Sequence, residues 1–574
     1  MLNNNFLRNR LCWILALLCF LSLFLFIGQT EFNTRGEPRE ALVGLAMLEE
    51  GNWTLPITNG TDIAYKPPLF HWMIAAVSTV IGEVNEYTSR MPSAIALAVM
   101  VLSGFFFYAR RRGSELAFLM SIITLTNFEV HRAGTNCRVD MVLSALMVLA
   151  IYQLYRWYEK GLKGVPWMGI LCLSGAFLSK GPVGLVLPCM VAGVFCLLRG
   201  YNFFKAFFSL AWVAIAACII PFIWYYAAWK QGGDTFLNLV LEENVYRFLG
   251  KMTYTSHENP WHYNVLTLVT GFIPYTLLLL TSLFGLHKIT ISSKPRQWWN
   301  SLKTKVQQMD DTRLYSLVSI VIMFVFYCIP KSKRSVYLLP IYPFIAYFIA
   351  EYIIYLAKNK QKAITLYNYI LCGLGIVLPI VFAVVKAGLV PHSIFGGRHA
   401  ADNIAIIEAL EHLPLGVNLV IVILPLALAV YYLTSNKDEV KRTYAGALIA
   451  FALFFSLDGV YLPAILNLKS NKAVAERIAK EYPGKKVYSF ITLTEKGNRM
   501  HPFSVNFYLK NQVVPFIDFE PKEGLLILED REYDIFNQMY GQQFALQLVP
   551  RSLYKSCDYH GMTQIYEFKE IEKQ

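Results

Sequence analysis

The chain alternates long apolar segments with shorter polar ones along most of its length. A transmembrane helix needs about 20 mainly apolar residues, with a lower limit near 17. Two of the apolar segments, 165–179 and 183–198, are shorter than this and are assigned as spans from their context. The pattern predicts thirteen transmembrane helices, near residues 11–28, 90–109, 115–131, 139–155, 165–179, 183–198, 206–229, 264–286, 314–329, 335–356, 364–386, 414–434 and 443–462.

Basic residues follow this pattern on alternate loops. Lys and Arg near the ends of spans favour the cytoplasmic side of a membrane. With the N-terminus inside, the seven inner loops carry Arg8 and Arg10, Arg110 to Arg112, Arg156 with Lys160 and Lys163, Arg199 with Lys205, Lys288 to Lys305, Lys358 to Lys362, and Lys437 to Arg442. The outer segments are then 29–89, 130–138, 230–262, 330–335 and the C-terminal tail.

Composition agrees with a polytopic membrane protein. The 574 residues are 55% hydrophobic and 16% charged, and the mean hydropathy is +0.42. The net charge of +13 is spread over short inner loops rather than gathered in a basic domain, so nucleic-acid binding is not predicted. The ten cysteines form no CxxC pair, which argues against a disulfide framework or a zinc site. The first apolar run lacks a small-x-small cleavage site, so it is expected to remain as a helix.

Two domains are predicted: a transmembrane domain over 1–466 and a soluble α/β domain over 467–574. In the outer segment 29–89, two apolar helical stripes at 38–50 and 68–82 each begin at proline and end at glycine. Both are expected to lie at the membrane surface. In the tail, the pattern predicts strands at 487–490, 524–528, 544–549 and 564–568, and helices at 470–481, 503–510 and 532–539.

Charged residues gather on the outer face, close to apolar sequence. Charges near hydrocarbon depth are costly and tend to mark functional sites. The cations suit an anion such as a phosphate, and the carboxylates suit a base that takes a proton from an acceptor. These residues are Glu37, Arg39, Lys66, Arg138, Asp140, Lys180, Lys331, Lys333 and Arg334.

Each of these residues also has a structural interpretation. Arg35 and Arg39 can pair with Glu37 and Glu40. Asp140 can be a first-turn helix residue favoured by the helix dipole. Lys66 can be a snorkelling anchor and Lys180 a turn lysine, and the cations from Lys331 to Arg334 can be a plain surface loop. His71 is interpreted as a helix residue, since no HxxxH or His/Cys pair supports a metal.

The order of the motifs along the chain resembles one family, the GT-C membrane glycosyltransferases, and within it the aminoarabinose transferase (ArnT) and protein O-mannosyltransferase-like group. The motifs are Arg35-Gly-Glu-Pro-Arg39-Glu-Ala41, Gly51-Asn-Trp53, Lys66-Pro-Pro-Leu69, Arg90-Met-Pro-Ser93, Arg138-Val-Asp140, Ser179-Lys-Gly-Pro-Val183, Glu243-Asn244 with Arg247-Phe248, His257, Pro260-Trp261, and Ser332-Lys333 with Tyr337-Leu-Leu-Pro340. They cover roughly residues 1–345.

This resemblance implies a GT-C fold with surface helices after the first span, a cavity on the outer face, and a polyprenyl-phosphate-linked sugar as donor. It implies that Tyr65, Arg247, His257 and Tyr337 line the cavity. Two positions depart from the family pattern: Gly36 stands where ArnT-like enzymes carry Asp, and Tyr65 where they carry an acid. Both changes remove carboxylates. The sequence therefore predicts no definite cofactor, and it leaves open whether a divalent metal binds and which residue is the base.

The sequence is therefore interpreted as a glycosyltransferase of the bacterial cytoplasmic membrane, with its active site on the periplasmic side. Glu37 first, or Asp140, activates the acceptor, and the sugar is transferred with inversion. The acceptor is a lipid such as lipid A, a glycan or a protein. The donor phosphate is expected to face Arg39, Lys66, Arg138, Lys180, Lys333 and Arg334. The alternative is a transporter or flippase of lipid-linked sugars, which needs no acid beside the cations and is expected to show internal repeats; no repeat is visible.

Overall fold

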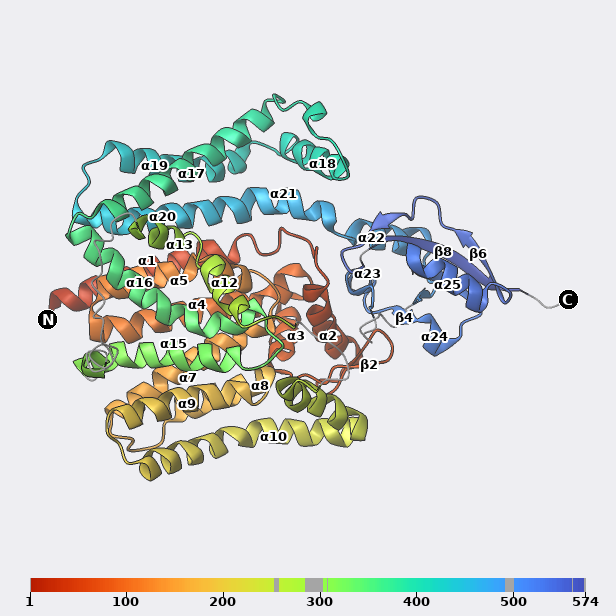
Figure 1. Cartoon of the computed structure of the whole chain (residues 1–574). Coiled ribbons are helices and arrows are strands. Elements are labelled where there is room, and N and C mark those ends of the chain that lie inside the picture. The colour runs from red at the N-terminus through yellow and green to blue at the C-terminus, as the bar shows by residue number, and fades with distance from the viewer. Residues whose placement is uncertain are drawn as a thin grey trace.

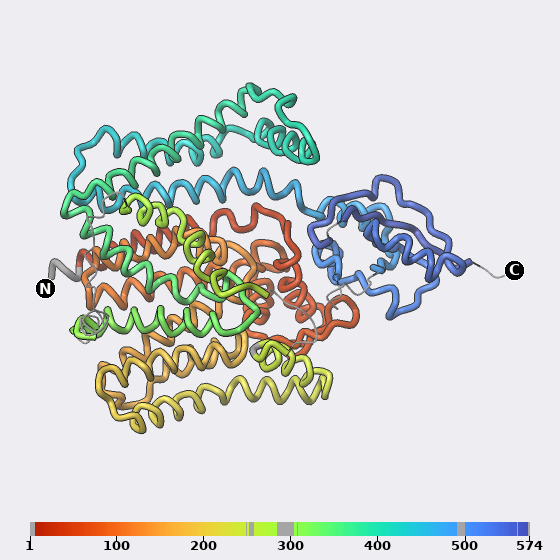
Figure 2. Tube along the Cα trace, viewed as in Figure 1, coloured from red at the N-terminus to blue at the C-terminus, as the bar shows by residue number. Residues whose placement is uncertain are grey.

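The computed structural model describes residues 2–251, 258–283, 303–306, 308–490, 500–559 and 561–571. Long helices run alongside one another through most of the molecule, and a small domain with a β-sheet sits beyond one end of them (Figure 1). The N-terminus lies at the opposite end from that domain (Figure 2).

Nine helical segments in the described ranges are long and apolar enough to cross a membrane. Six of them lie within a single helix: Phe6–Phe24 of α1 (Leu2–Phe24), α4 (Glu86–Arg112), α7 (Val139–Glu159), α15 (Asp311–Cys328), α17 (Lys362–Lys386) and α19 (Gly416–Thr434). The other three join consecutive helices. Phe203–Tyr246 contains α10 (Phe203–Leu241), Ser335–Lys358 contains η2 (Ser335–Ile341) and α16 (Tyr342–Lys358), and Glu439–Lys469 contains α20 (Glu439–Ser456), η4 (Leu457–Tyr461), α21 (Leu462–Leu466) and η5 (Asn467–Lys469).

The other predicted spans are shorter or bent. The predicted span 264–286 corresponds to α12 (His262–Gly271) and α13 (Thr276–Leu283), which meet at 97° and extend to the limit of the described residues at 283. The predicted spans 165–179 and 183–198 are α8 (Trp167–Lys180) and α9 (Val183–Leu198). A multi-pass α-helical fold is confirmed, whereas thirteen complete crossings stay a prediction.

The predicted helix 115–131 is two helices, α5 (Ser114–Leu125) and α6 (Phe128–Gly134). Asn127 separates them. Its side-chain amide donates to the carbonyls of Ile123 and Thr124, at 3.1 and 2.8 Å, and its Oδ1 accepts from the amide of Val130 at 3.1 Å. One side chain thus ends α5 and caps α6, which hydrophobic periodicity does not reveal.

Apolar side chains cover the outside of the bundle. Along α10, the described side chains of Phe207, Ile215, Phe222 and Ile223 are each more than half exposed. An exposed apolar surface of this extent in a soluble protein is costly, but it suits a lipid environment.

The basic loops meet at the end of the bundle that carries the N-terminus. Arg111 at the end of α4 pairs with Glu159 at the end of α7, at 2.5 Å. Arg112 pairs with Asp310 at 3.1 Å and Arg199 pairs with Asp311 at 2.7 Å. Loops predicted on the inner side therefore share one end, as alternation of the spans requires.

At the other end, the outer segment forms two predicted helices and a hairpin that was not predicted. Helix α2 (Gly36–Glu50) ends at Gly51 with φ 68°, and α3 (Leu69–Ile81) ends at Gly82 with φ 104°. Both glycines adopt the left-handed conformation of a helix C-cap. Between the helices, β1 (Ile57–Thr58) pairs antiparallel with β2 (Asp62–Ile63).

The tail contains a sheet with the order β4-β3-β5-β8-β6. The four predicted strands are confirmed as β3 (Val487–Ser489), β5 (Glu523–Glu529), β6 (Phe544–Leu548) and β8 (Met562–Glu570). Strands β4 (Val513–Pro515) and β7 (Tyr554–Lys555) were missed, as was helix α24 (Phe516–Phe519). The predicted helices are α22 (Lys472–Glu481), α23 (Phe503–Tyr508) and α25 (Asp530–Tyr540). The structure also contains the helices α18 (Ala400–Glu411), η1 (Glu242–Tyr246), α11 (Arg247–Leu249) and η3 (His392–Ile394).

The tail domain is fixed onto the outer segment. Tyr508 at the end of α23 donates to Glu86 at 2.8 Å and accepts from the amide of Phe32 at 3.0 Å. Asn506 donates to Asn59 of the hairpin at 2.8 Å. A Cβ at Gly60 would lie 2.7 Å from Val514, so the hairpin and the sheet domain approach each other closely. The tail therefore covers the outer segment rather than hanging free of it.

The sidedness of the chain gives a labelling prediction. Gln538→Cys on α25 and Lys358→Cys at the end of α16 both place a thiol at an exposed position. In spheroplasts, a membrane-impermeant maleimide should label Gln538→Cys directly and Lys358→Cys only after permeabilisation. The unsubstituted protein, with its ten native cysteines, sets the background. Labelling of both positions from the same side would contradict the topology.

Candidate active site

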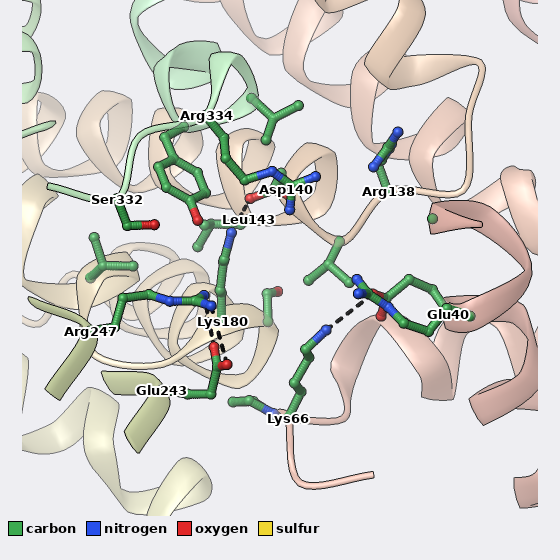
Figure 3. A pocket seen from close by; sticks show the side chains of 18 of the residues that line it. Glu40, Lys66, Arg138, Asp140, Leu143, Lys180, Glu243, Arg247, Ser332 and Arg334 are labelled. Carbon is green, nitrogen blue, oxygen red and sulfur yellow. Dashed lines mark hydrogen bonds and ion pairs between the residues drawn. The ribbon is translucent and has the colours of Figure 1, made fainter. Parts of the chain in front are cut away.

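A cavity of about 810 Å³ opens at the outer end of the helices. Its wall comes from the start of α2, the loop before α3, the start of α7, the turn between α8 and α9, η1, and η2 with the loop before it. The tail domain supplies a further part of the lining. Charged side chains from all of these membrane-domain elements surround the space (Figure 3).

One group of charges is centred on Glu40, which is 6% exposed. Its Oε1 accepts from Arg39 at 2.6 Å and from Lys66 at 3.1 Å, and its Oε2 lies 3.0 Å from His71 Nε2. Burial opposes ionisation of Glu40, but Lys66, Arg39 and His71 outweigh it and hold the pKa of this carboxyl well below its usual value. Burial and the charge of Arg39 lower the pKa of Lys66. The Arg39 and Lys66 side chains stay 45% and 37% exposed, so both cations reach the cavity.

A second group is centred on Asp140, in the first turn of α7. Lys180, in the last turn of α8, donates to its Oδ1. The Lys180 ammonium also lies 4.3 Å from the centre of the Tyr337 ring. Arg334 lies beside this pair and lines the cavity as well (Figure 3). Gly181 follows with φ +92°, and a Cβ there would lie 2.6 Å from Asn244 Oδ1, so the turn after Lys180 packs tightly against η1.

A third pair lies on the irregular helix that follows α10. Arg247 Nη1 is 2.7 Å from Glu243 Oε2, four residues earlier. Both residues line the cavity. Arg138 lines it from the α7 side, and a Cβ built on Gly36 would lie 3.2 Å from Arg138 Nη1. The glycine that stands at the position of the expected Asp therefore lets the Arg138 guanidinium approach the backbone more closely than a side chain there would allow.

Apolar residues form another part of the wall, between α7, α9 and α15. They are Leu143, Val183, Val186, Phe326 and Val336. The cavity thus joins a cluster of cations to an apolar surface that continues into the helix bundle. A phosphate attached to a hydrocarbon tail has matching parts.

Glu37 was predicted as the first candidate for the base, but the structure places it elsewhere. It is 2% exposed and forms a two-point ion pair with Arg90, at 2.8 and 3.1 Å. Its Oε1 also accepts from the amide of Cys137 at 2.8 Å. Burial opposes its ionisation, but Arg90 and the Cys137 amide hold the pKa of Glu37 below its usual value. Glu37 does not line the large cavity, because its partners on α4 and before α7 hold it in a smaller neighbouring pocket that it lines together with Arg90 and Arg138.

Lys333 also differs from its expected position. Its ammonium donates to the carbonyl of Pro330 at 2.5 Å, the residue is 5% exposed, and the cavity lining includes its neighbours Ser332 and Arg334 instead. The other donor-phosphate candidates, Arg39, Lys66, Arg138, Lys180 and Arg334, all line the cavity. So do Tyr65, Arg247 and Tyr337, whereas His257 lies outside the described residues.

Several lining residues were not among the predicted site residues. Glu40 was considered only as an ion-pair partner of arginine, although its place one turn after Gly36 faces the cavity. Glu243 was quoted in a motif without a role. His501 and Asp558 come from the tail, where no local motif marks them. Across the described part of the chain, no group of three or more His, Cys, Asp or Glu side chains is arranged to hold a metal ion.

The fold and the site define a polytopic protein with the GT-C architecture. The structure matches ArnT from Cupriavidus metallidurans bound to undecaprenyl phosphate over 97% of both chains, with a TM-score of 0.69 and 16% sequence identity. It matches the same protein in the apo state with a TM-score of 0.66, 15% identity and the same 97% coverage of both chains.

Sequence comparisons agree with this assignment. Residues 65–226 match the family described as dolichyl-phosphate-mannose-protein mannosyltransferase. An undecaprenyl phosphate-alpha-4-amino-4-deoxy-L-arabinose arabinosyl transferase of Proteus mirabilis is 28% identical over 370 residues, covering 61% of this chain and 62% of the relative. One from Shewanella sediminis is 24% identical over 378 residues and 63% of each chain. The match thus spans less than two thirds of these relatives. The predicted resemblance to ArnT-like GT-C glycosyltransferases is confirmed.

The position of Glu37 gives a prediction about stability. Glu37→Ala leaves Arg90 charged and buried, which typically costs about 3–5 kcal/mol. The free energy of unfolding in detergent should fall by this amount, whereas Glu83→Ala, at an exposed position of the same segment, should change it by less than about 0.5 kcal/mol. The double variant Glu37→Met/Arg90→Met should recover much of the loss, since an apolar pair leaves no buried charge. Equal costs for Glu37→Ala and Glu83→Ala would contradict the buried ion pair.

Proposed function

We propose that this protein is a glycosyltransferase that moves a sugar from a polyprenyl-phosphate donor to an acceptor at the periplasmic face of a bacterial cytoplasmic membrane. The observation that carries the proposal is the cavity itself, in which seven lysine or arginine side chains and four carboxylates adjoin an apolar wall. The fold shared with an ArnT that was solved with undecaprenyl phosphate supports the same donor class. The periplasmic side follows from the basic loops at the opposite end.

The donor phosphate fits between the two cationic groups. Arg39 and Lys66 line the cavity from α2 and from the loop before α3, and Lys180 and Arg334 line it from the end of α8 and from the residue before η2. Arg39 and Lys66 pair with Glu40, Lys180 pairs with Asp140, and Arg334 lies beside Asp140, so a phosphate would share these cations with the carboxylates. The polyprenyl tail would follow the apolar residues between α7, α9 and α15.

The reaction is a substitution at the anomeric carbon. An acceptor oxygen forms the new bond to this carbon while the bond to the phosphate oxygen breaks, so the configuration inverts. The electron pair of the broken bond stays on the polyprenyl phosphate, whose added charge is stabilised by the lysines and arginines. The proton of the acceptor passes to a carboxylate.

Asp140 is the better placed of the two predicted bases. It lines the cavity, whereas Glu37 is fully engaged by Arg90 and the Cys137 amide. Lys180 orients the Asp140 carboxylate through a hydrogen bond to Oδ1. Arg138, two residues before Asp140, lines the same space and adds positive charge near the leaving group.

A transporter or flippase is the less favoured alternative. A binding site for a lipid-linked sugar explains the cations and the apolar wall, but it needs no carboxylate at the reacting centre. Incubation of purified protein with a panel of radiolabelled polyprenyl-phosphate sugars and bacterial envelope extract tests the proposal. Label that stays entirely in the donor fraction with every sugar and extract would overturn it.

The cationic side of the site gives the next prediction. Lys66→Ala, Arg39→Ala and Arg334→Ala should each lower donor affinity or turnover roughly 10- to 100-fold, because a charge-assisted contact to phosphate contributes on the order of 1.5–3 kcal/mol. Lys66→Arg should not restore full activity, since a guanidinium is larger and its donors are planar. Lys331→Ala removes an exposed cation from the same loop as Arg334 and should behave as wild type. Wild-type transfer by the three site variants would reject this placement of the phosphate.

The role of Asp140 gives a separate prediction. Asp140→Asn keeps the shape of the side chain but cannot take a proton, so turnover should fall by about 10²-fold or more. The dissociation constant for undecaprenyl phosphate should not rise, because the substitution removes a negative charge beside the cations. Normal turnover in Asp140→Asn would mean that the acceptor arrives already ionised, as a phosphate does, and that no general base acts.

A further inference from the structure

The tail domain contributes a part of the cavity that the proposed transfer reaction does not use. Met500, His501, Phe503 and Asp558 line this part, which we call the tail wall. Phe503 begins α23, and Asp558 lies between β7 and β8. The tail wall faces a space whose remaining charged lining comes from the membrane domain.

Asp558 is a buried carboxylate, and one of its two oxygens has no hydrogen-bond partner in the described part of the chain. The residue is 3% exposed, and its Oδ2 accepts from the amide of Ser504 at 3.0 Å. Its Oδ1 is buried and has no hydrogen-bond partner among the residues that the structure describes. A buried acceptor without a partner is destabilising, so the position favours a ligand that donates a hydrogen bond.

His501 presents a similar acceptor. It is 4% exposed, and its Nε2 lies 3.0 Å from Oδ2 of Asp62 in the hairpin of the outer segment. An ionised carboxylate can only accept, so in the neutral ring Nε2 carries the proton and Nδ1 is left as an acceptor. Within the described ranges, Nδ1 is buried and has no partner.

We propose that Asp558 and His501 form the acceptor subsite and bind hydroxyl groups of a polyhydroxylated acceptor, as in a glycan, rather than a phosphate. This inference rests on the proposed glycosyltransferase function. Two acceptor atoms on one wall need two donors, which neighbouring hydroxyls supply. An acceptor phosphate would bring further acceptor oxygens and negative charge against the Asp558 carboxylate.

The surroundings of Asp558 support this assignment. Burial raises the pKa of Asp558 to about 7, against the smaller lowering effects of the Ser504 amide and the charge of Arg35. A hydrogen bond donated by a hydroxyl favours the ionised form of the carboxyl and so opposes the effect of burial.

The tail wall is also held rigidly enough to select a substrate. Asn511 accepts from the amide of Asn59 at 3.0 Å, next to the bond between Asn506 and Asn59. These contacts tie α23 to the same hairpin whose Asp62 orients His501. Binding residues supported by such secondary contacts keep their geometry without help from the ligand.

The variant that tests the subsite is Asp558→Asn. Its side-chain oxygen can keep the hydrogen bond from the Ser504 amide, which puts the amide nitrogen in the place of Oδ1 and replaces an acceptor by a donor. The KM for the acceptor should rise at least tenfold, while the dissociation constant for undecaprenyl phosphate and the melting temperature stay at wild-type values. Asp534→Asn, at an exposed position on α25 of the same domain, is the matched control and should leave both constants unchanged.

The acceptor class is tested with bacterial envelope extract, using labelled polyprenyl-phosphate sugar as donor. Acetylation of the extract, which caps hydroxyl groups, should abolish transfer by the wild-type protein, and phosphatase treatment should not. Loss of transfer after phosphatase treatment, or an unchanged acceptor KM in Asp558→Asn, would overturn the inference while leaving the glycosyltransferase function intact. No transfer by wild type to any untreated extract would overturn the proposed function and the inference with it.

Discussion

The ion pair between Glu37 and Arg90 holds the outer end of this protein together. Both residues are 2% exposed, and burial of two charges is tolerated only when each finds its full set of partners. Arg90 also donates to the carbonyls of Ile27 and Thr30, and Glu37 accepts from the Cys137 amide. One pair therefore connects the end of the first span, α2, α4 and the loop that leads into α7. The positions of Arg39, Glu40 and Asp140 around the cavity all depend on those four segments.

The cavity also contains ion pairs between carboxylates and cations, but these pairs are less deeply buried than the pair of Glu37 and Arg90. Glu40, Asp140 and Glu243 each hold cations, but those cations remain partly exposed, with side-chain exposures of 37% for Lys66, 30% for Lys180 and 24% for Arg247. Carboxylates that pair with partly exposed cations keep these cations ionised and oriented, while the positive charges still reach solvent. A second anion can share such cations without breaking the pairs. The buried pair at Glu37 is thus a structural element, whereas the pairs around the cavity are suited to binding.

Local patterns in the sequence predicted much of this structure. Hydrophobic periodicity located the long helices, the two helices of the outer segment and four strands of the tail, because those elements follow from residues close in sequence. Charge alternation predicted the candidate cations on the side opposite the basic inner loops, and five of the six predicted donor-phosphate cations line one cavity. The role of Glu37 could not be predicted from a local pattern, since its partner lies 53 positions away and its neighbours Arg35 and Arg39 appeared to be the natural partners. Asp558 and His501 reach the cavity only because a separate domain folds back onto the hairpin at Asn59.

A glycosyltransferase must break the bond between the sugar and the phosphate in this cavity. The most direct test uses a polyprenyl-phosphate sugar that carries ¹⁴C in the sugar and ³²P in the phosphate, added to proteoliposomes with bacterial envelope acceptor. We expect the two labels to separate, with ¹⁴C in the acceptor fraction and ³²P in polyprenyl phosphate, and to separate more slowly, by about 10²-fold or more, with the Asp140→Asn protein. Movement of both labels together across the bilayer, in an intact donor, would contradict the account and identify a transporter.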